Sequence, residues 1–261
     1  MKRIMGAVMV TAALTAPGLA ADLGERSYTK APAMAAPPVT NWSGLYIGGN
    51  VGYGWGSGGP DVALLPSIDF GVVAPTFGGR RNGAVGGAQI GYNWQAGSIV
   101  AGLEADIQGS ADRGSDRTVL SDLTGAPVAG LLGSSDQRMS WFGTFRGRVG
   151  FTAIPELLIY ATGGLAYGQI DASADTFFSA TNHYPTSVSQ TKAGWTVGGG
   201  TEWAFARNWS AKIEYLYVDL GNVSATALNA PVPADGPGDS VRYSWHTKEN
   251  IARVGVNYHF N

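Results

Sequence analysis

Asn-Ile-Ala-Arg-Val-Gly-Val-Asn-Tyr-His-Phe, residues 250–260, alternates between two kinds of side chain. One row is apolar and consists of Ala252, Val254, Val256, Tyr258 and Phe260, and the other, mostly polar, consists of Ile251, Arg253, Gly255, Asn257 and His259. Successive side chains of a β-strand point to opposite faces, so this pattern predicts a strand between two different surroundings. The pattern fits both a strand that faces water and a strand that faces lipid, and the remaining sequence has to distinguish them.

The amino terminus has the three parts of a secretory signal peptide. Lys2 and Arg3 precede an apolar run over 4–14, and small residues follow up to Ala21. This order predicts export and cleavage near that alanine, so residues 1–21 are assigned to the signal peptide. A single membrane anchor is the alternative, but the run is well short of the roughly 20 residues that a spanning helix needs.

Composition excludes several classes of protein. The chain has 39 glycines, no cysteine and a formal net charge of −2, and it has no concentrated basic run, so no nucleic-acid partner is expected. No later stretch approaches the ~18 consecutive apolar residues of a spanning helix. A closed, hydrogen-bonded barrel would hold an exported chain together without disulfides, and it is the one spanning structure left if the protein lies in a membrane.

Alternating segments recur throughout the mature chain. Residues 22–40 hold three prolines among alanines and small polar residues, which predicts a Pro/Ala-rich periplasmic linker. Eight segments with strand alternation follow, at 42–55, 84–95, 98–109, 140–151, 157–168, 193–205, 208–219 and 248–260. The fold expected for 41–261 is therefore all-β: an eight-stranded antiparallel up-and-down transmembrane β-barrel.

The connections between these segments alternate between short and long. Short connections are expected at 95–97, 152–156 and 206–208, and long ones, rich in Gly, Pro, Asp and Ser, at 56–83, 110–139, 169–192 and 220–247. Outer-membrane barrels have short periplasmic turns and longer exterior connections. The sequence thus predicts short periplasmic turns and four long exterior loops.

One face of the predicted strands is apolar and carries aromatic residues toward both ends. The residues predicted to lie at the lipid interface are Trp55, Trp141 and Trp195 near the exterior ends, and Trp94, Trp203, Trp209, Tyr258 and Phe260 near the periplasmic ends. Two aromatic rows are expected where a barrel crosses the two surfaces of a bilayer. For any single tryptophan, ordinary core packing is the alternative.

The opposite face collects charged residues of both signs. They are Glu104, Asp106, Arg146, Arg148, Glu202, Lys212, Glu214 and Arg253. Predicted neighbours are complementary: strand 98–109 lies beside 140–151, Glu202 beside Lys212, and Glu214 beside Arg253. An eight-stranded barrel is just wide enough for side chains to fill, so a paired charge network in the lumen is expected. A soluble barrel around an apolar ligand would have the opposite arrangement.

Several ordered motifs resemble a known family. They are WSGLYIGGNVGYGW at 42–55, GGAQIGYNW at 86–94, GLEAD at 102–106, TFRGRVG at 144–150, EYLYVDL at 214–220 and RVGVNYHF at 253–260. In these motifs the chain resembles the small outer-membrane β-barrel proteins of alphaproteobacteria, of the porin-family or surface-antigen type. One departure is Asn261, which follows the terminal aromatic residue on which family members usually end.

The resemblance implies an abundant, surface-exposed protein of the Gram-negative cell outer membrane. Its implied partners are outer-membrane lipid and lipopolysaccharide, and the barrel-assembly machinery that reads the C-terminal strand. Some relatives are described as porins and others as heme-binding surface proteins, and the resemblance does not choose between them. The oligomeric state is not indicated by the sequence.

Two sets of side chains were considered as catalytic sites. His183 with Ser179 and Asp175, or His246 with Ser244 and Asp239, contain the residue types of a nucleophilic triad. No nucleophile elbow accompanies either set, so no enzymatic activity is predicted. No metal site or cofactor is predicted either, because cysteine and closely spaced histidines are absent from the sequence.

Three functional hypotheses follow from these observations. The first is a structural, surface-exposed barrel whose lumen is largely plugged by side chains. The second is a narrow porin for small hydrophilic solutes, with the same charges lining its lumen. The third is capture of a ligand such as heme by the exterior loops, with His183 or His246 as candidate contacts.

Overall fold

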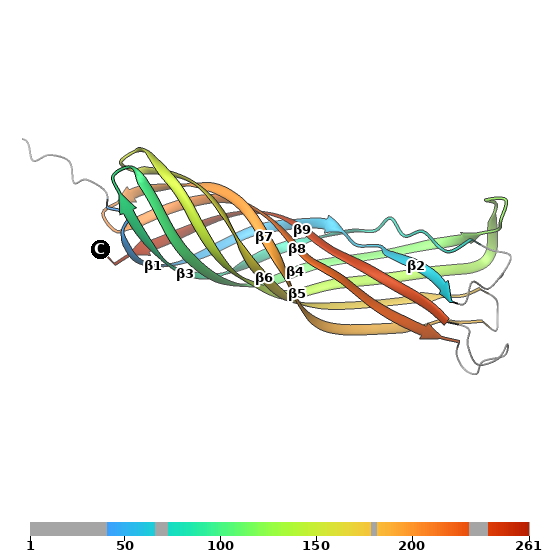
Figure 1. Cartoon of the computed structure of the whole chain (residues 1–261). Coiled ribbons are helices and arrows are strands. Elements are labelled where there is room, and N and C mark those ends of the chain that lie inside the picture. The colour runs from blue at the N-terminus through green and yellow to red at the C-terminus, as the bar shows by residue number, and fades with distance from the viewer. Residues whose placement is uncertain (1–40, 66–72, 179–181, 230–239, 261) are drawn as a thin grey trace, which may run out of the picture. The chain divides into compact units, whose positions relative to one another are not determined.

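The folded part of the chain is a single antiparallel sheet that closes on itself (Figure 1). A computed structural model describes residues 41–65, 73–178, 182–229 and 240–260. The predicted signal peptide and linker, and Asn261, lie outside the described residues. The described residues include no helix with the length and apolar character needed to traverse a membrane.

Nine strands are present in the described part of the chain. They are β1 (Gly44–Ser57), β2 (Pro60–Leu65), β3 (Arg80–Ala96), β4 (Ile99–Ser121), β5 (Pro127–Ile154), β6 (Leu157–Thr176), β7 (Thr186–Ala206), β8 (Trp209–Leu228) and β9 (Ser240–His259). Strand β1 pairs with β3, and β3 to β9 each pair with the following strand, always antiparallel. A further pairing of β1 with β9 completes a ring of eight. This ring and its seam between the first and last strands confirm the predicted topology. The short β2 was not predicted, and it pairs with the outer end of β9.

The prediction of four long exterior loops was wrong for most of these residues. The described residues of segments 110–139, 169–192 and 220–247 are mostly strand, and β4 runs for 23 residues and β5 for 28. Among the described residues, β4 and β5 are separated by only 122–126. We call these three segments together with β2 the extension, because β4 to β9 continue in them past the closed ring (Figure 1).

The physical reason for the error lies in the outer face of the extension. Asp136 and Arg138 of β5 are exposed, whereas Ser135 and Gln137, which alternate with them, are buried. A strand whose outer face meets water carries the same Ser, Asp and Arg residues that are typical of loops. Composition alone therefore does not distinguish a strand with a water-exposed outer face from a loop.

The short turns at the opposite end of the ring agree with the prediction. Gly97 lies between β3 and β4 with a φ of 62°, in the left-handed region that glycine adopts without strain. Only residues 97–98, 155–156 and 207–208 separate the successive strands at this end. The chain therefore reverses direction here within two residues.

The inner face of β9 shows how the lumen is layered. Four of its inward residues each represent one layer. From the short-turn end outward they are Arg253, Ile251, Glu249 and, in the extension, Trp245, and all four are at most 2% exposed. The layers formed around them are a charge network, an apolar cluster, a smaller charged group with Arg81, and a second apolar cluster. The lumen is filled by packed side chains at each of these levels.

Candidate functional site

All eight charged residues predicted for the lumen lie inside the ring, and each is at most 5% exposed. Arg146 is at the centre, where its guanidinium contacts three carboxylates. It pairs with Glu104, its Nη2 lies 2.9 Å from Asp106 Oδ2, and its Nη1 lies 3.2 Å from Glu214 Oε1. One cation thus joins carboxylates from β4 and β8, on different sides of the ring.

The other cations extend this network across the lumen. Arg253 lies 2.5 Å from Glu214 and 2.9 Å from Asp106. Lys212 Nζ lies 3.0 Å from a carboxylate oxygen of Glu104. With four acidic and four basic members, the network is balanced in charge, so each buried ion has a partner to offset its desolvation.

One predicted neighbour pair does not form an ion pair in the described structure. Glu202 and Lys212 are opposite each other in the β7–β8 register, but Glu202 pairs with Arg148 at 2.6 Å, and Lys212 reaches Glu104 instead. The narrow lumen brings strands from opposite sides of the ring within reach of one side chain. Cross-lumen contacts therefore replace the contact along the neighbouring strand.

Two tyrosines that sequence reasoning missed complete the network. The hydroxyl of Tyr46 donates to Glu104 at 2.8 Å, and that of Tyr160 donates to Glu214 at 2.8 Å. The Arg148 guanidinium lies over the Tyr160 ring, 4.2 Å from its centroid. A usable signal was present, because both tyrosines are large inward residues on strands that contribute no charge to the network.

The short-turn end of the lumen holds a second polar group that was not predicted. Ser210 Oγ donates to Glu202 at 2.6 Å and lies 2.9 Å from His259 Nε2. Trp42 packs edge-on against the His259 ring, with the ring centroids 5.7 Å apart. Although a serine, a histidine and a glutamate meet here, Ser210 is 0% exposed, so a dissolved substrate does not reach its hydroxyl.

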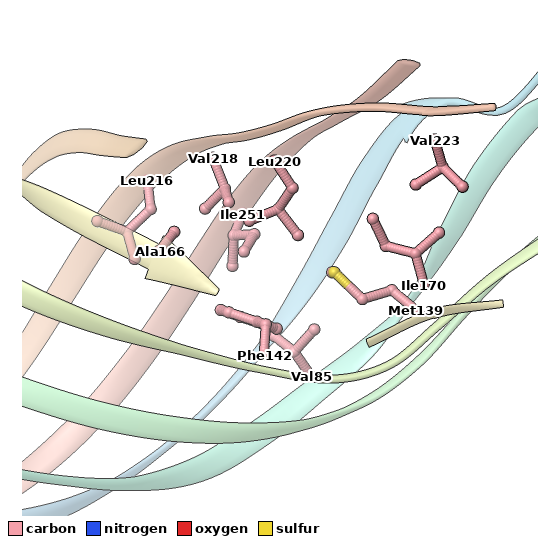
Figure 2. Close-up of a cluster of buried hydrophobic side chains, with 10 residues drawn as sticks. All are labelled: Val85, Met139, Phe142, Ala166, Ile170, Leu216, Val218, Leu220, Val223 and Ile251. Carbon is pink, nitrogen blue, oxygen red and sulfur yellow. The ribbon is translucent and has the colours of Figure 1, made fainter. Parts of the chain in front are cut away.

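An apolar layer lies directly beyond the charge network. Figure 2 shows its side chains from opposite sides of the ring pointing toward one another. Its members are Val85, Met139, Phe142, Ala166, Ile170, Leu216, Val218, Leu220, Val223 and Ile251, none more than 4% exposed. Burial of a large apolar side chain contributes ~1.5–3 kcal/mol, so this layer stabilises the ring.

The first of the two sets that contain triad residue types is assembled in part. His183 Nε2 lies 2.6 Å from Asp175 Oδ1, and its ring stacks on Phe177 with the centroids 4.2 Å apart. Ser179 lies outside the described residues. The imidazole nitrogen that would serve as a base or as a heme ligand is therefore already engaged by a carboxylate.

The second set is not assembled in the described part of the chain. His246 Nε2 lies 3.5 Å from Asp61 of β2. Ser244 Oγ lies 2.9 Å from Ser224 Oγ on β8. Asp239 lies outside the described residues.

The aromatic residues predicted for the lipid interface lie on the outer face of the ring. Trp141 and Tyr258 are half-buried, and the other six, Trp55, Trp94, Trp195, Trp203, Trp209 and Phe260, are 42–56% exposed. Trp141 contacts Tyr167 at a centroid distance of 6.0 Å, whereas Trp209 contacts Tyr258 at 5.1 Å. Between these two groups, the outward side chains of the described ring carry no charge.

The described chain thus forms a closed ring with an apolar outer belt and a charged interior. The family model described as outer membrane protein beta-barrel domain matches residues 27–260. The chain belongs to this outer-membrane β-barrel family. Its location in the outer membrane, predicted from the sequence, agrees with this membership.

Relatives of this outer-membrane β-barrel include named proteins of alphaproteobacteria. The chain is 36% identical to the 31 kDa outer-membrane immunogenic protein of Brucella melitensis, covering 96% of this chain and 97% of that protein. It is 31% identical to the 22 kDa outer membrane protein of Rhizobium leguminosarum, covering 87% and 83%. These relatives confirm the resemblance drawn from the sequence motifs.

A solved structure is also similar at low identity. The outer membrane protein OprG from Pseudomonas aeruginosa is 12% identical, with 84% of this chain and 98% of that chain covered and a TM-score of 0.47.

Proposed function

We propose that this protein is a non-conducting barrel with a structural, surface-exposed role in the outer membrane. The burial of the inward side chains carries this proposal. Arg146, Phe142 and Leu216, which represent two successive layers of the lumen, are each 0% exposed. Side chains that line a water-filled channel would be in contact with solvent, and these are not.

The proposal includes the orientation of the barrel. The apolar belt and its two aromatic rows would lie in the bilayer, in contact with lipid and lipopolysaccharide. The short turns would face the periplasm, and the extension would project from the cell. The C-terminal strand β9 is followed directly by Phe260, which is 53% exposed, and β9 would be the strand that the barrel-assembly machinery recognises.

The alternatives have less support from the described geometry. A narrow porin would need the cross-lumen ion pairs and the apolar layer to separate together. Heme ligation by His183 would need its Nε2 to leave Asp175, which lies 2.6 Å away. A role without enzymatic activity is supported by the relatives, whose names describe outer-membrane and immunogenic proteins.

Conductance of the refolded chain in planar bilayers tests the proposal. We expect no steady single-channel steps at neutral pH and moderate salt. Steady steps that disappear in Arg146→Gln but persist in Arg138→Gln would contradict the plugged lumen, because Arg138 is half-exposed on the outer face. The Arg138 variant controls for the loss of one positive charge at a site away from the lumen.

A further inference from the structure

The outer face of the extension carries two rows of polar side chains across β4 to β7. In register, Arg113 is opposite Arg138, Arg138 opposite Asp171, and Asp171 opposite Ser189. Two residues further out, a second row runs through Ser115, Asp136, Ser173 and Ser187. Arginine and hydroxyl groups thus lie side by side over four neighbouring strands.

A groove of about 620 Å³ is lined by both rows. It lies on the outer face, because row members such as Arg113 and Asp136 are exposed whereas Gln137 and Ala172 between the rows are at most 4% exposed and point inward. A groove of this size accommodates a sugar-sized group.

The groove is lined by two arginines and two aspartates, so its formal charges cancel, but only one of these arginines forms an ion pair in the described part of the chain. Asp171 accepts from Arg138 at 3.0 Å, from Ser140 at 3.0 Å and from Ser189 at 2.5 Å, so its carboxylate is fully engaged. Arg113 forms no ion pair within the described part of the chain, although it is directly opposite Arg138. Like charges directly across a strand pair destabilise a sheet, so an anion between these two guanidinium groups would relieve the repulsion.

The groove begins where the apolar belt ends. On β5 and β6, Trp141 of the outer aromatic row is opposite Gln169. The next two pairs are Met139 with Ile170, and Arg138 with Asp171. The first polar row therefore lies directly beyond the outer aromatic row. Below the aromatic row, the same strands present Phe145 and Leu165, which are 52% and 65% exposed. A molecule with apolar chains and a polar head would meet the belt and the groove together.

We propose that this groove binds the phosphate-bearing sugar headgroup of an outer-leaflet glycolipid. Arg113 and Arg138 would hold the phosphate, since guanidinium groups bind phosphate through paired hydrogen bonds. The serine hydroxyls and Asp136 would bind sugar hydroxyls, and the acyl chains would lie along the belt. The site rests on the membrane orientation given under the proposed function.

Binding of a phosphorylated lipid A to the refolded full chain in detergent tests this site. Arg113→Gln is expected to weaken binding about tenfold or more, the effect of losing a charge-assisted hydrogen bond. Arg113→Lys keeps the charge but loses the paired geometry, and an intermediate loss is expected. Arg242→Gln is the matched control, because Arg242 is exposed on β9, between β2 and β8 and away from the groove.

A second comparison needs no substitution. The unaltered chain should bind the dephosphorylated lipid about tenfold or more weakly than the phosphorylated form, by the same loss of charge-assisted contacts. Equal binding of the two lipids, or an equal loss in the Arg113 and Arg242 variants, would overturn the site. Conductance is not measured in this assay, so a failure of the plugged lumen is recognised separately.

Discussion

At the scale of single residues, the structure distinguishes charged side chains buried in the lumen from charged side chains exposed on the outer face. Arg146 is 0% exposed and contacts three carboxylates, whereas the side chain of Arg138 is 51% exposed and contacts one. Removing one member of a buried network leaves the remaining charges without compensation. An exposed pair is screened by water and contributes little. The two arginines therefore have very different expected effects on stability.

Replacing Arg146 by Gln should lower the free energy of unfolding by about 3–5 kcal/mol, because Glu104, Asp106 and Glu214 would lose a shared cation. Replacing Arg138 by Gln should change it by less than about 1 kcal/mol. Urea-induced unfolding of the barrel in lipid vesicles measures both changes in unfolding free energy. The dependence of that free energy on urea concentration is fitted with one slope for all variants. Similar losses for the two variants would show that the lumen network does not stabilise the ring.

The contribution of Asp171, on the outer face of the extension, to the stability of the fold is expected to depend on pH. Hydrogen bonds from Ser189, together with Arg138 and Ser140, lower the pKa of Asp171 from 3.8 to about 2. Because the pKa is lowered in the folded chain, the contribution of Asp171 to stability is present above about pH 4 and is lost as pH falls toward 2. Carboxyl NMR titration should show this pKa rising toward its ordinary value in Ser189→Ala. The control Ser187→Ala, in the second row, should leave it in place.

At the scale of strands, the alternation of side chains predicted a strand only where the outward residues are apolar. Where outward residues are apolar, as in Leu103 and Ile107 of β4, the strand was recognised. Where the same strand continues with Arg113 and Ser115 outward, the alternation became polar and was interpreted as a loop. The charges of the lumen were recognisable from their shared parity. Pairs between neighbouring strands, such as Glu214 with Arg253, were recognisable as well. Contacts across the lumen, such as Lys212 with Glu104, were not, because they depend on closure of the ring.

The folded state of the extension can be tested at Trp245. This side chain is 0% exposed, packs in the second apolar cluster and donates through Nε1 to Ser135 Oγ at 3.1 Å. Trp245→Ala should destabilise the extension by about 3–5 kcal/mol. Hydrogen exchange should accelerate over 110–139, 220–228 and 240–247 while the ring strands below remain protected. Trp94→Ala, on the outer face near the short-turn end, should leave exchange in the extension unchanged, and equal effects would argue against an independently packed extension.

At the scale of the whole molecule, two layers of different chemistry fill the same lumen. The side chains of Arg146 in the charge network and of Phe142 in the apolar layer are both fully buried, and under the proposed function each layer would block the passage of water. Weakening one layer leaves the other in place, so Arg146→Gln or Phe142→Ala alone should keep conductance near zero in planar bilayers. Combining them should raise it, since hydrophobic constrictions open when they become wet. Conductance in either single variant would show that one layer alone forms the seal.

With the extension projecting from the cell, as proposed, the continuation of strands into it would also determine what an antibody meets at the cell surface. Arg113, Asp171 and Ser189 are far apart in the sequence, yet they belong to one row across four paired strands. An epitope on such a surface is assembled from several hairpins and disappears when the sheet unfolds. Peptides copied from a single hairpin would therefore reproduce only a strip of the antigenic surface, and the intact barrel would be needed to present the whole of it.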